Sequence, residues 1–217
     1  MTPERKQAEE VDHPRFARIY MRMKSGDRDQ AEDEHRRTLL AGLAGDVIEV
    51  GSGHGLNFPL YPDAVEKVLA VEPEALLREA AGKEAAAAPV EVEVVDGVAG
   101  ALPAPDSSQD AAIASLVLCS VSDQDRALRE LRRVLRPGGE LRFYEHVVAH
   151  KRVPAALQRF ADATFWPRVA GGCHMARDTR TAIERAGFAI ERIDRFQFSP
   201  GVPVPRMPHI IGVARST

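Results

Sequence analysis

The chain has 217 residues, of which 44% are hydrophobic and 28% are charged, a balance typical of a globular domain. These values exclude a disulfide-stapled miniprotein, a fibre and a disordered tail, and a single domain of this length can bury a core without metals or crosslinks. The 29 basic and 32 acidic residues give a net charge of -3. No overall charge therefore attracts the chain to nucleic acid or anionic lipid, and we expect a small-molecule substrate.

The sequence contains two cysteines, Cys119 and Cys173. Their separation does not fit a zinc-binding pair, and so few thiols in a chain of this length favour a reducing compartment. The amino-terminal residues lack the apolar core of a signal peptide, and no stretch has the roughly 18 uninterrupted apolar residues that a membrane span needs. We therefore expect a cytoplasmic protein without a membrane span. Its oligomeric state does not follow from the sequence.

Residues 1–29 are polar and interrupted by proline and glycine, which predicts an N-terminal lid or tail that includes Tyr20. Apolar periodicity over 30–43 predicts an amphipathic helix at the start of a single domain covering 30–217. Further helices are predicted at residues 74–86, between Ser122 and Pro137, at 155–165 and at 179–186. Seven strands are predicted at residues 47–50, 67–71, 90–95, 111–118, 140–147, 188–198 and 209–214.

This alternation of strands and helices predicts parallel strands joined by crossover helices. Several prolines separate the last two strands, which predicts that these strands pair as an antiparallel edge hairpin with a long connection. The predicted fold class is therefore α/β, with an open, mostly parallel seven-stranded sheet and helices on both faces.

A glycine-rich loop follows the first predicted strand and contains Gly51, Gly53 and Gly55. Open α/β sheets bind ligands at the carboxyl ends of their strands, and glycine lets the backbone approach a ligand closely. Glu72 ends the second predicted strand, 21 residues after Gly51. An acid at this offset can accept hydrogen bonds from both hydroxyls of a ribose, although a solvated acid at a strand end is the alternative.

The glycine spacing also discriminates between nucleotide ligands. The order G-x-G-x-G lacks the third glycine of the dinucleotide fingerprint, and no Gly-Lys-Ser/Thr follows it, as a P-loop would require. The loop therefore favours an adenosine ligand without a pyrophosphate.

Five ordered motifs resemble the motif series of the class I S-adenosylmethionine-dependent methyltransferases, in the branch that acts on small molecules, over residues 36–147. They are Glu49 to Gly55, Glu72-Pro73, Leu102-Pro103 with Asp106 and Asp110, Ser115 to Leu118, and Leu135 to Gly139. A narrower similarity connects nearly the whole chain with a methyltransferase-like group whose animal members methylate alkyl thiols. It rests on Asn57-Phe58, Tyr61-Pro62, Leu116 to Val121, Tyr144 to Val147, Gly172-Cys173 and Pro208 to Gly212.

The resemblance implies a Rossmann-like fold and the cofactor S-adenosyl-L-methionine, with S-adenosyl-L-homocysteine as product. The cofactor-binding residues that it implies are Glu49, Gly51, Ser52, Gly53, Asn57, Glu72, Pro73, Val98, Ala99, Ser115 and Leu116. The implied catalytic residues are Cys119 and His146, and the implied substrate contacts are Tyr20, Glu145, Cys173 and His174. Substrate would enter between the amino-terminal segment and an insertion over residues 148–178.

Two features depart from these families. Many methyltransferases carry an acid before the Leu-Pro motif to bind the adenine amino group, whereas this chain has Val98-Ala99, so we expect backbone groups and apolar packing to hold adenine. We do not expect Asp96 to replace this acid, because it lies two residues before Val98 and projects on the same strand phase. The thiol-methylating group also has an amino-terminal membrane helix that this sequence lacks, so a membrane location is not carried over.

Several candidate residues have simpler interpretations. His146 also fits a structural histidine at a strand end, Cys119 a small buried hydrophobe, and Phe160, Phe165 and Trp166 core residues rather than pocket walls. Adjacent strand residues point to opposite faces, so Glu145 and His146 do not pair. Cys173-His174 does not close a zinc site, and no metal is expected.

We expect an enzyme that moves a methyl group by in-line displacement to a small, apolar acceptor, with a thiol favoured over a phenol, an amine or an activated carbon. The alternatives are a non-catalytic nucleotide-binding module of the same fold and an NAD-linked oxidoreductase, which the glycine spacing opposes. The arginines between residues 126 and 136 alternate with acids at helical spacing, which is typical of a solvated face rather than a nucleic-acid site.

Overall fold

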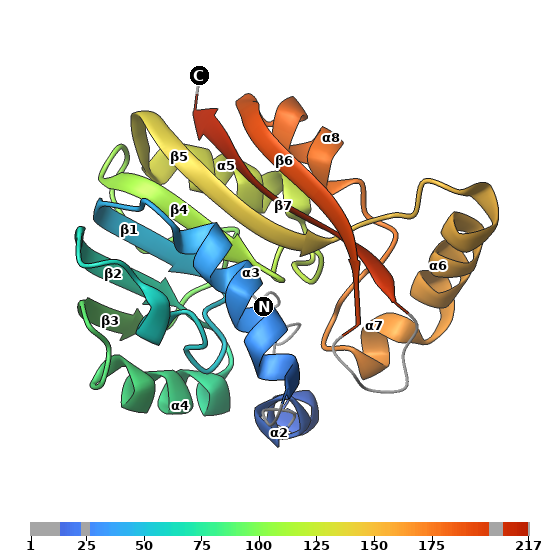
Figure 1. Ribbon diagram of the computed structural model, residues 1–217, viewed down its shortest axis with the longest axis horizontal. Helices are drawn as coiled ribbons and strands as arrows, with labels where there is room; N and C mark the ends of the chain where they lie inside the picture. The colour runs from blue at the N-terminus through green and yellow to red at the C-terminus, as the bar shows by residue number, and fades with distance from the viewer. Residues whose placement is uncertain (1–13, 23–26, 200–205, 217) are drawn as a thin grey trace, which may run out of the picture.

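The computed structural model describes residues 14–22, 27–199 and 206–216. Within them, seven strands form one sheet in the order β3-β2-β1-β4-β5-β7-β6, shown in Figure 1. The strands are β1 (Gly45–Val50), β2 (Val65–Val71), β3 (Glu91–Val95), β4 (Gln109–Ser115), β5 (Leu135–His146), β6 (Phe188–Phe198) and β7 (Met207–Ser216). The predicted number of strands is confirmed.

Strand directions also agree with the prediction. β1 is parallel to β2 and β4, β2 to β3, and β4 to β5. β7 pairs with β5 on one side and with β6 on the other, antiparallel to both. It therefore lies inside the sheet, and β6 forms the edge. An antiparallel pair needs no crossover helix, so a connection of a few residues between β6 and β7 is enough. The prolines at 200, 203 and 205 lie outside the described residues.

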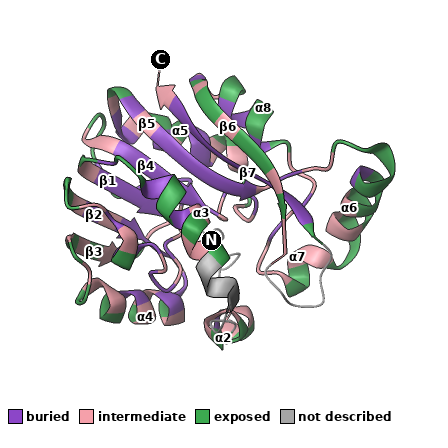
Figure 2. Ribbon diagram, in the orientation of Figure 1, coloured by how far each residue is buried: buried purple, intermediate pink, exposed green. Residues whose placement is uncertain are grey.

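Helices cover both faces of the sheet. They are α2 (Pro14–Arg22), α3 (Asp27–Leu40), α4 (Ala75–Ala85), α5 (Gln124–Val134), α6 (Arg152–Thr164), α7 (Trp166–Val169) and α8 (Thr179–Arg185), with a 3-10 turn η1 (Phe58–Leu60). Strand alternation divides the core in two: Ile48 and Phe143 pack with α5 and α8, whereas Val47 and Tyr144 pack with α3. Figure 2 shows the resulting burial of the central strands.

The fourth strand is shorter than predicted. It ends at Ser115 because Leu116 has a φ of 58°, a left-handed conformation that turns the chain out of the sheet. Left-handed backbone costs a residue with a side chain about 1–2 kcal/mol. Residues 117 and 118, predicted as strand, therefore belong to a turn at the carboxyl end of β4.

Other boundaries move by a few residues. The helix predicted for 30–43 spans 27–40, and the strand predicted from residue 140 begins at Leu135. The segment predicted as a lid or tail includes the helix α2, while residues 1–13 and 23–26 lie outside the description.

The segment between β5 and β6 carries α6 and α7, which lie beside the sheet in Figure 1. Phe160 and Phe165 are 66% and 52% exposed, so their interpretation as core residues is wrong. Trp166 is partly exposed and lines a cavity that is described below. In the described part of the chain, no helix is both long enough and apolar enough to cross a membrane.

Candidate active site

A cavity of about 950 Å³ lies at the carboxyl ends of the parallel strands, bordered by α2 on one side and by the loop before α8 on the other. The predicted site residues line this cavity, with the exception of Asn57 and Glu145. The sheet order reverses between β1 and β4, because β1 connects to β2 on one side and the chain returns to β4 on the other. Parallel α/β sheets bind ligands at such a switch point.

The loop after β1 depends on its glycines. Gly51, Gly53 and Gly55 have φ values of 63°, 59° and 88°, which favour glycine. A Cβ on Gly51 would lie 2.4 Å from a methyl carbon of Val117. The Gly51 N–H donates a 2.8 Å hydrogen bond to the Val71 carbonyl oxygen, which holds the loop against the end of β2.

Glu72 lies at the end of β2 and is only 5% exposed, so its interpretation as a solvated acid is wrong. Its carboxylate oxygens accept hydrogen bonds from the N–H groups of Gly53, at 2.8 Å, and Glu74, at 3.0 Å. A carboxylate has about four acceptor sites, so about two remain for a ligand. Burial raises the pKa of Glu72 to about 7.

A buried polar network backs the loop. Arg36 on α3 donates through one nitrogen to Asn57 Oδ1 at 3.0 Å and to Ser115 Oγ at 3.2 Å. Asn57 Nδ2 and Tyr61 Oη donate to the two oxygens of Glu49 at 2.8 and 2.7 Å. Burial raises the pKa of Glu49 to about 7. The network joins α3, the glycine loop and the ends of β1 and β4.

This network corrects one prediction and adds one residue. Asn57 is fully buried and does not line the cavity, contrary to its prediction as a cofactor contact, because Arg36 binds its amide oxygen and Glu49 binds its amide nitrogen. Arg36 lines the cavity and was missed. In the sequence it is one of several charged residues on a polar helix, and only packing against β1 and β4 distinguishes it.

The predicted adenine region lies beside β3. Val98 and Ala99 line the cavity together with Gly97 and Gly100, and Val98 forms an isolated bridge with Ala101. Asp96 is 72% exposed and pairs with an arginine of α4 at 3.1 Å. Asp96 does not line the cavity.

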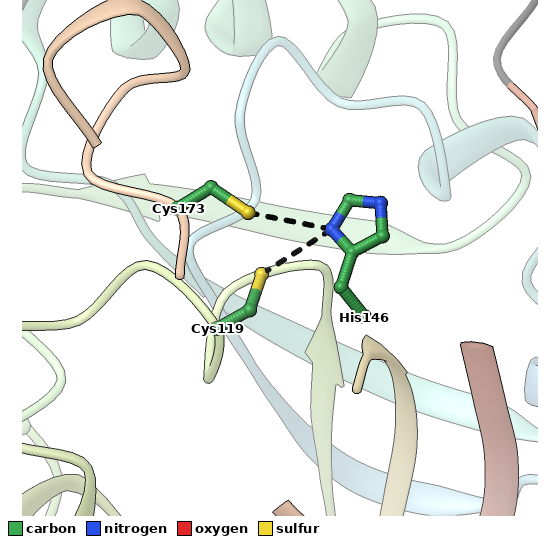
Figure 3. Close-up of side chains that lie close together, drawn as sticks. All are labelled: Cys119, His146 and Cys173. Carbon is green, nitrogen blue, oxygen red and sulfur yellow. Dashed lines mark hydrogen bonds between the residues drawn. The ribbon is translucent and has the colours of Figure 1, made fainter. Parts of the chain in front are cut away.

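Two cysteines and a histidine meet in the wall of the cavity. Both thiols point at the same ring nitrogen in Figure 3: His146 Nδ1 lies 3.7 Å from Cys119 Sγ and 3.4 Å from Cys173 Sγ. These residues come from the turn after β4, the end of β5 and the loop before α8. The sequence separation of the two cysteines does not predict this contact, although both are predicted at the same site. Contact with Cys173 and burial raise the pKa of the Cys119 thiol.

Glu145 does not face the cavity, contrary to its prediction as a substrate contact. It is fully buried, and its carboxylate accepts three backbone hydrogen bonds, from Val117 at 3.0 Å, Leu118 at 2.8 Å and Cys119 at 3.0 Å. Strand alternation explains this direction, because His146 occupies the cavity side. Glu145 therefore holds the turn that carries Cys119.

The amino-terminal helix covers the glycine loop. Tyr20 stacks on Phe16, with ring centroids 5.6 Å apart, and meets the edge of His54 at 5.1 Å. Phe16 and Tyr20 both line the cavity, as does His174 at the far end, whose N–H donates to the Cys119 carbonyl oxygen at 2.8 Å.

Three buried polar atoms on the cavity wall have no hydrogen-bond partner among the described residues. They are Ser52 Oγ, Tyr144 Oη and Trp166 Nε1. Buried polar groups are normally hydrogen-bonded, so these atoms indicate a polar ligand or ordered water in the cavity. Of these three residues, the sequence predicts Ser52 as a site residue and offers a pocket wall as the alternative to the core for Trp166, whereas Tyr144 was missed.

Comparison with known proteins gives consistent matches. A family model described as "Methyltransferase domain" matches residues 48–143. The mouse protein thiol S-methyltransferase TMT1B is 37% identical over 91% of this chain and 81% of its own length. Human thiol S-methyltransferase TMT1A is 34% identical over 77% of this chain and 69% of its own length. A SAM-dependent methyltransferase structure from Thermotoga maritima superposes with a TM-score of 0.68 at 20% identity, over 94% of this chain and 97% of that one.

Proposed function

This chain belongs to the class I S-adenosylmethionine-dependent methyltransferases, and from that premise we propose that it transfers the methyl group to the sulfur of a small, apolar thiol. Methyltransferase activity on a small acceptor follows from the family. The thiol acceptor is supported by the two relatives named above and by the Cys119–His146–Cys173 cluster that lines the cavity.

One observation carries the proposal: the glycine loop with Glu72 and the Cys119–His146–Cys173 cluster line one and the same cavity. Such an arrangement can hold a methyl donor and a sulfur acceptor facing each other. The volume of about 950 Å³ is also in the range of pockets that take ligands of this size.

The residues present fit S-adenosylmethionine. The free acceptor sites of Glu72 suit the two ribose hydroxyls, and the unpartnered Ser52 Oγ suits a polar group of the methionine part. Arg36 adds a buried cation beside the loop, which suits the carboxylate of that part. Backbone groups around Val98 and Ala99 remain for adenine, with Pro73, Ser115 and Leu116 completing the wall.

When bound, the cofactor supplies a methyl carbon that is already activated by the positive charge of its sulfonium. The protein's task is positioning, which contributes about 7–11 kcal/mol for well-oriented reactants. Leu116 and Val117 turn the chain toward the cavity at the end of β4, and Cys119 and His146 face the acceptor side. Trp166 and the α2 helix border the same space, which limits water around the reacting atoms.

The apolar character of the acceptor is supported by apolar side chains in the lining of the cavity. They include Val121, Val169, Phe198 and Met207. A side chain or alkyl group of the acceptor would bury apolar surface there at about 25 cal/mol per Å².

Calorimetry and an acceptor panel test the proposal. We expect S-adenosylhomocysteine to bind and NAD not to bind. With radiolabelled S-adenosylmethionine, we expect methyl transfer to alkyl thiols and much slower transfer to matched phenols and amines. Binding without transfer to any acceptor would favour the non-catalytic module, NAD binding would favour the oxidoreductase, and preferred transfer to a phenol or amine would contradict the thiol assignment.

A further inference from the structure

We propose that Cys119, His146 and Cys173 form a zinc site whose fourth position opens into the cavity and binds the acceptor sulfur as a thiolate. The role in thiol activation rests on the proposed function, whereas the metal site stands on its own geometry. Soft thiolate and imidazole donors favour zinc among the common divalent metals.

The distances fit a tetrahedral metal. Zinc binds sulfur at about 2.3 Å and nitrogen at about 2.0–2.1 Å, which places a sulfur and a nitrogen ligand about 3.5 Å apart on a tetrahedron and two sulfurs about 3.8 Å apart. The two sulfur-to-nitrogen distances are 3.7 and 3.4 Å, and all three ligand atoms lie within 4.8 Å of one another. Only small side-chain movements separate this arrangement from a zinc centre.

The two thiols converge on one nitrogen, His146 Nδ1. One imidazole nitrogen has one lone pair, which accepts one S–H. Cys119 Sγ also lies 3.5 Å from Ser120 Oγ, which gives this thiol another hydrogen-bond partner. A metal ion would instead use a lone pair from each of the three converging atoms.

The surrounding residues hold the three ligands in place. Glu145 fixes the Cys119 turn by three backbone hydrogen bonds, and the same strand presents His146. The His174 N–H donates to the Cys119 carbonyl oxygen, which joins the loop of Cys173 to that turn. The close approach requires Gly172, with a φ of 83°, because a Cβ there would lie 3.1 Å from the Ser120 carbonyl oxygen. Such support around the ligands is typical of metal sites.

The open position distinguishes a reactive site from a structural one. Structural zinc sites have four protein ligands, whereas catalytic sites have three and leave one position for water or substrate. Among the described residues, three side chains in this cluster could bind a metal ion, and each of them lines the cavity. Its fourth position therefore faces the space where the acceptor would bind.

The proposed step balances without a further reagent. The acceptor thiol binds zinc and releases its proton to solvent. A lone pair on the acceptor sulfur then forms the new bond to the methyl carbon, and the bond between that carbon and the sulfonium breaks, with its electron pair going to the donor sulfur. The products are a thioether and neutral S-adenosylhomocysteine, and the thioether, a weaker ligand, leaves the zinc.

Metal analysis tests the site directly. Protein purified with a reductant, without chelator and without a metal-affinity step, is expected to contain one zinc ion per chain by plasma mass spectrometry. After chelation, added Co²⁺ should give a thiolate-to-metal charge-transfer band and the visible bands of tetrahedral cobalt. Reduced protein that carries no zinc and takes up neither Zn²⁺ nor Co²⁺ would overturn the proposal.

Variants locate the ion. Cys119→Ser, His146→Gln and Cys173→Ser should each lower zinc affinity by about 100-fold or more, whereas the neighbouring His174→Gln should keep one zinc per chain. Circular dichroism shows which variants are folded. If a variant is unfolded, the cobalt spectrum of the unaltered protein tests whether the cysteines and the histidine bind the metal. Full zinc content in folded Cys119→Ser and Cys173→Ser proteins would contradict the assignment.

A third experiment separates this inference from the proposed function. If zinc removal abolishes methylation of alkyl thiols while calorimetric binding of S-adenosylhomocysteine is retained, and added zinc restores activity, the role is supported. Unchanged methylation by the metal-free enzyme overturns the inference and leaves the proposed function intact. A zinc-loaded protein that methylates no thiol overturns the role in thiol activation together with the proposed acceptor, while its metal content still supports the site.

Discussion

Glu72 shapes the glycine loop and also offers acceptor sites to a ligand. Two of its acceptor sites bind the N–H groups of Gly53 and Glu74, and the others face the cavity. Its burial makes each of these interactions strong, because little water competes for the carboxylate. Because the two backbone hydrogen bonds end on different oxygens of Glu72, a substitution that keeps one oxygen loses one of these loop bonds together with the charge offered to a ligand.

We expect Glu72→Gln to weaken binding of S-adenosylhomocysteine by roughly 10- to 150-fold, or about 1.5–3 kcal/mol, because charge-assisted hydrogen bonds to the ribose are lost. Isothermal titration calorimetry measures this. Asp96→Asn is the matched control, since Asp96 is exposed and lies outside the cavity, and its dissociation constant should not change. An unaltered dissociation constant for Glu72→Gln would remove this residue from the cofactor site.

The pKa of Glu72, about 7, also predicts a pH dependence. Only the ionised carboxylate accepts from both ribose hydroxyls, so binding at pH 6 requires loss of a proton that is already absent at pH 8. Affinity for S-adenosylhomocysteine should therefore fall about tenfold between pH 8 and pH 6. Glu72→Gln should remove this dependence in the same titrations, and an equal slope in both proteins would assign it to another group.

The C-terminal hairpin shows how an element can depend on one small residue. Gly212 on β7 packs between its neighbouring strands, and a Cβ there would lie 2.4 Å from the Arg192 carbonyl oxygen and 2.6 Å from the Phe143 ring. β7 in turn supports the end of β5 that carries His146, since His146 pairs with His209. Burial is the main reason that the pKa of His209 is lowered to about 3. The His209 side chain is therefore uncharged at neutral pH.

Gly212→Ala should lower the free energy of unfolding by about 1–3 kcal/mol through overpacking. Gly82→Ala in α4 is the opposite case: no atom lies within 4 Å of the added carbon, and helix propensity should raise stability by about 0.5–1 kcal/mol. Chemical denaturation of both variants checks the pair. If the free energy of unfolding changed equally in the two variants, the strands beside Gly212 would have to move apart enough to accept the added methyl group, and the predicted overpacking would be wrong.

For the molecule as a whole, ligand binding and stability are linked. A ligand that binds only the folded chain adds about 2.7 kcal/mol at a hundred times its dissociation constant. For a chain of this size, that should raise the Tm by about 5–11 °C. Differential scanning fluorimetry with S-adenosylhomocysteine should show this increase, and NAD at the same concentration should not. A matching increase with NAD would contradict the cofactor assignment.

Much of the fold could be predicted from the sequence because its signals are local. The seven apolar strands, the helices between them and the glycines after β1 each lie within a short window, where periodicity and backbone preference act directly. The strand boundary at Ser115 was missed because the left-handed turn at Leu116 is imposed by packing and by the hydrogen bonds that Glu145 makes to the following residues.

The sequence alone determined the α/β class, the cofactor loop and the acid at the end of β2, since these depend on residues close together in the chain. Only the tertiary structure decided which side chains face the cavity. Cys119, His146 and Cys173 stand at intervals of 27 residues and meet because β4, β5 and the loop before α8 end at the same edge of the sheet. Arg36 lines the cavity although the sequence did not predict it, and Glu145 does not line it although the sequence did. Both differences arise because the direction of a side chain depends on how the helix or strand packs in the folded sheet.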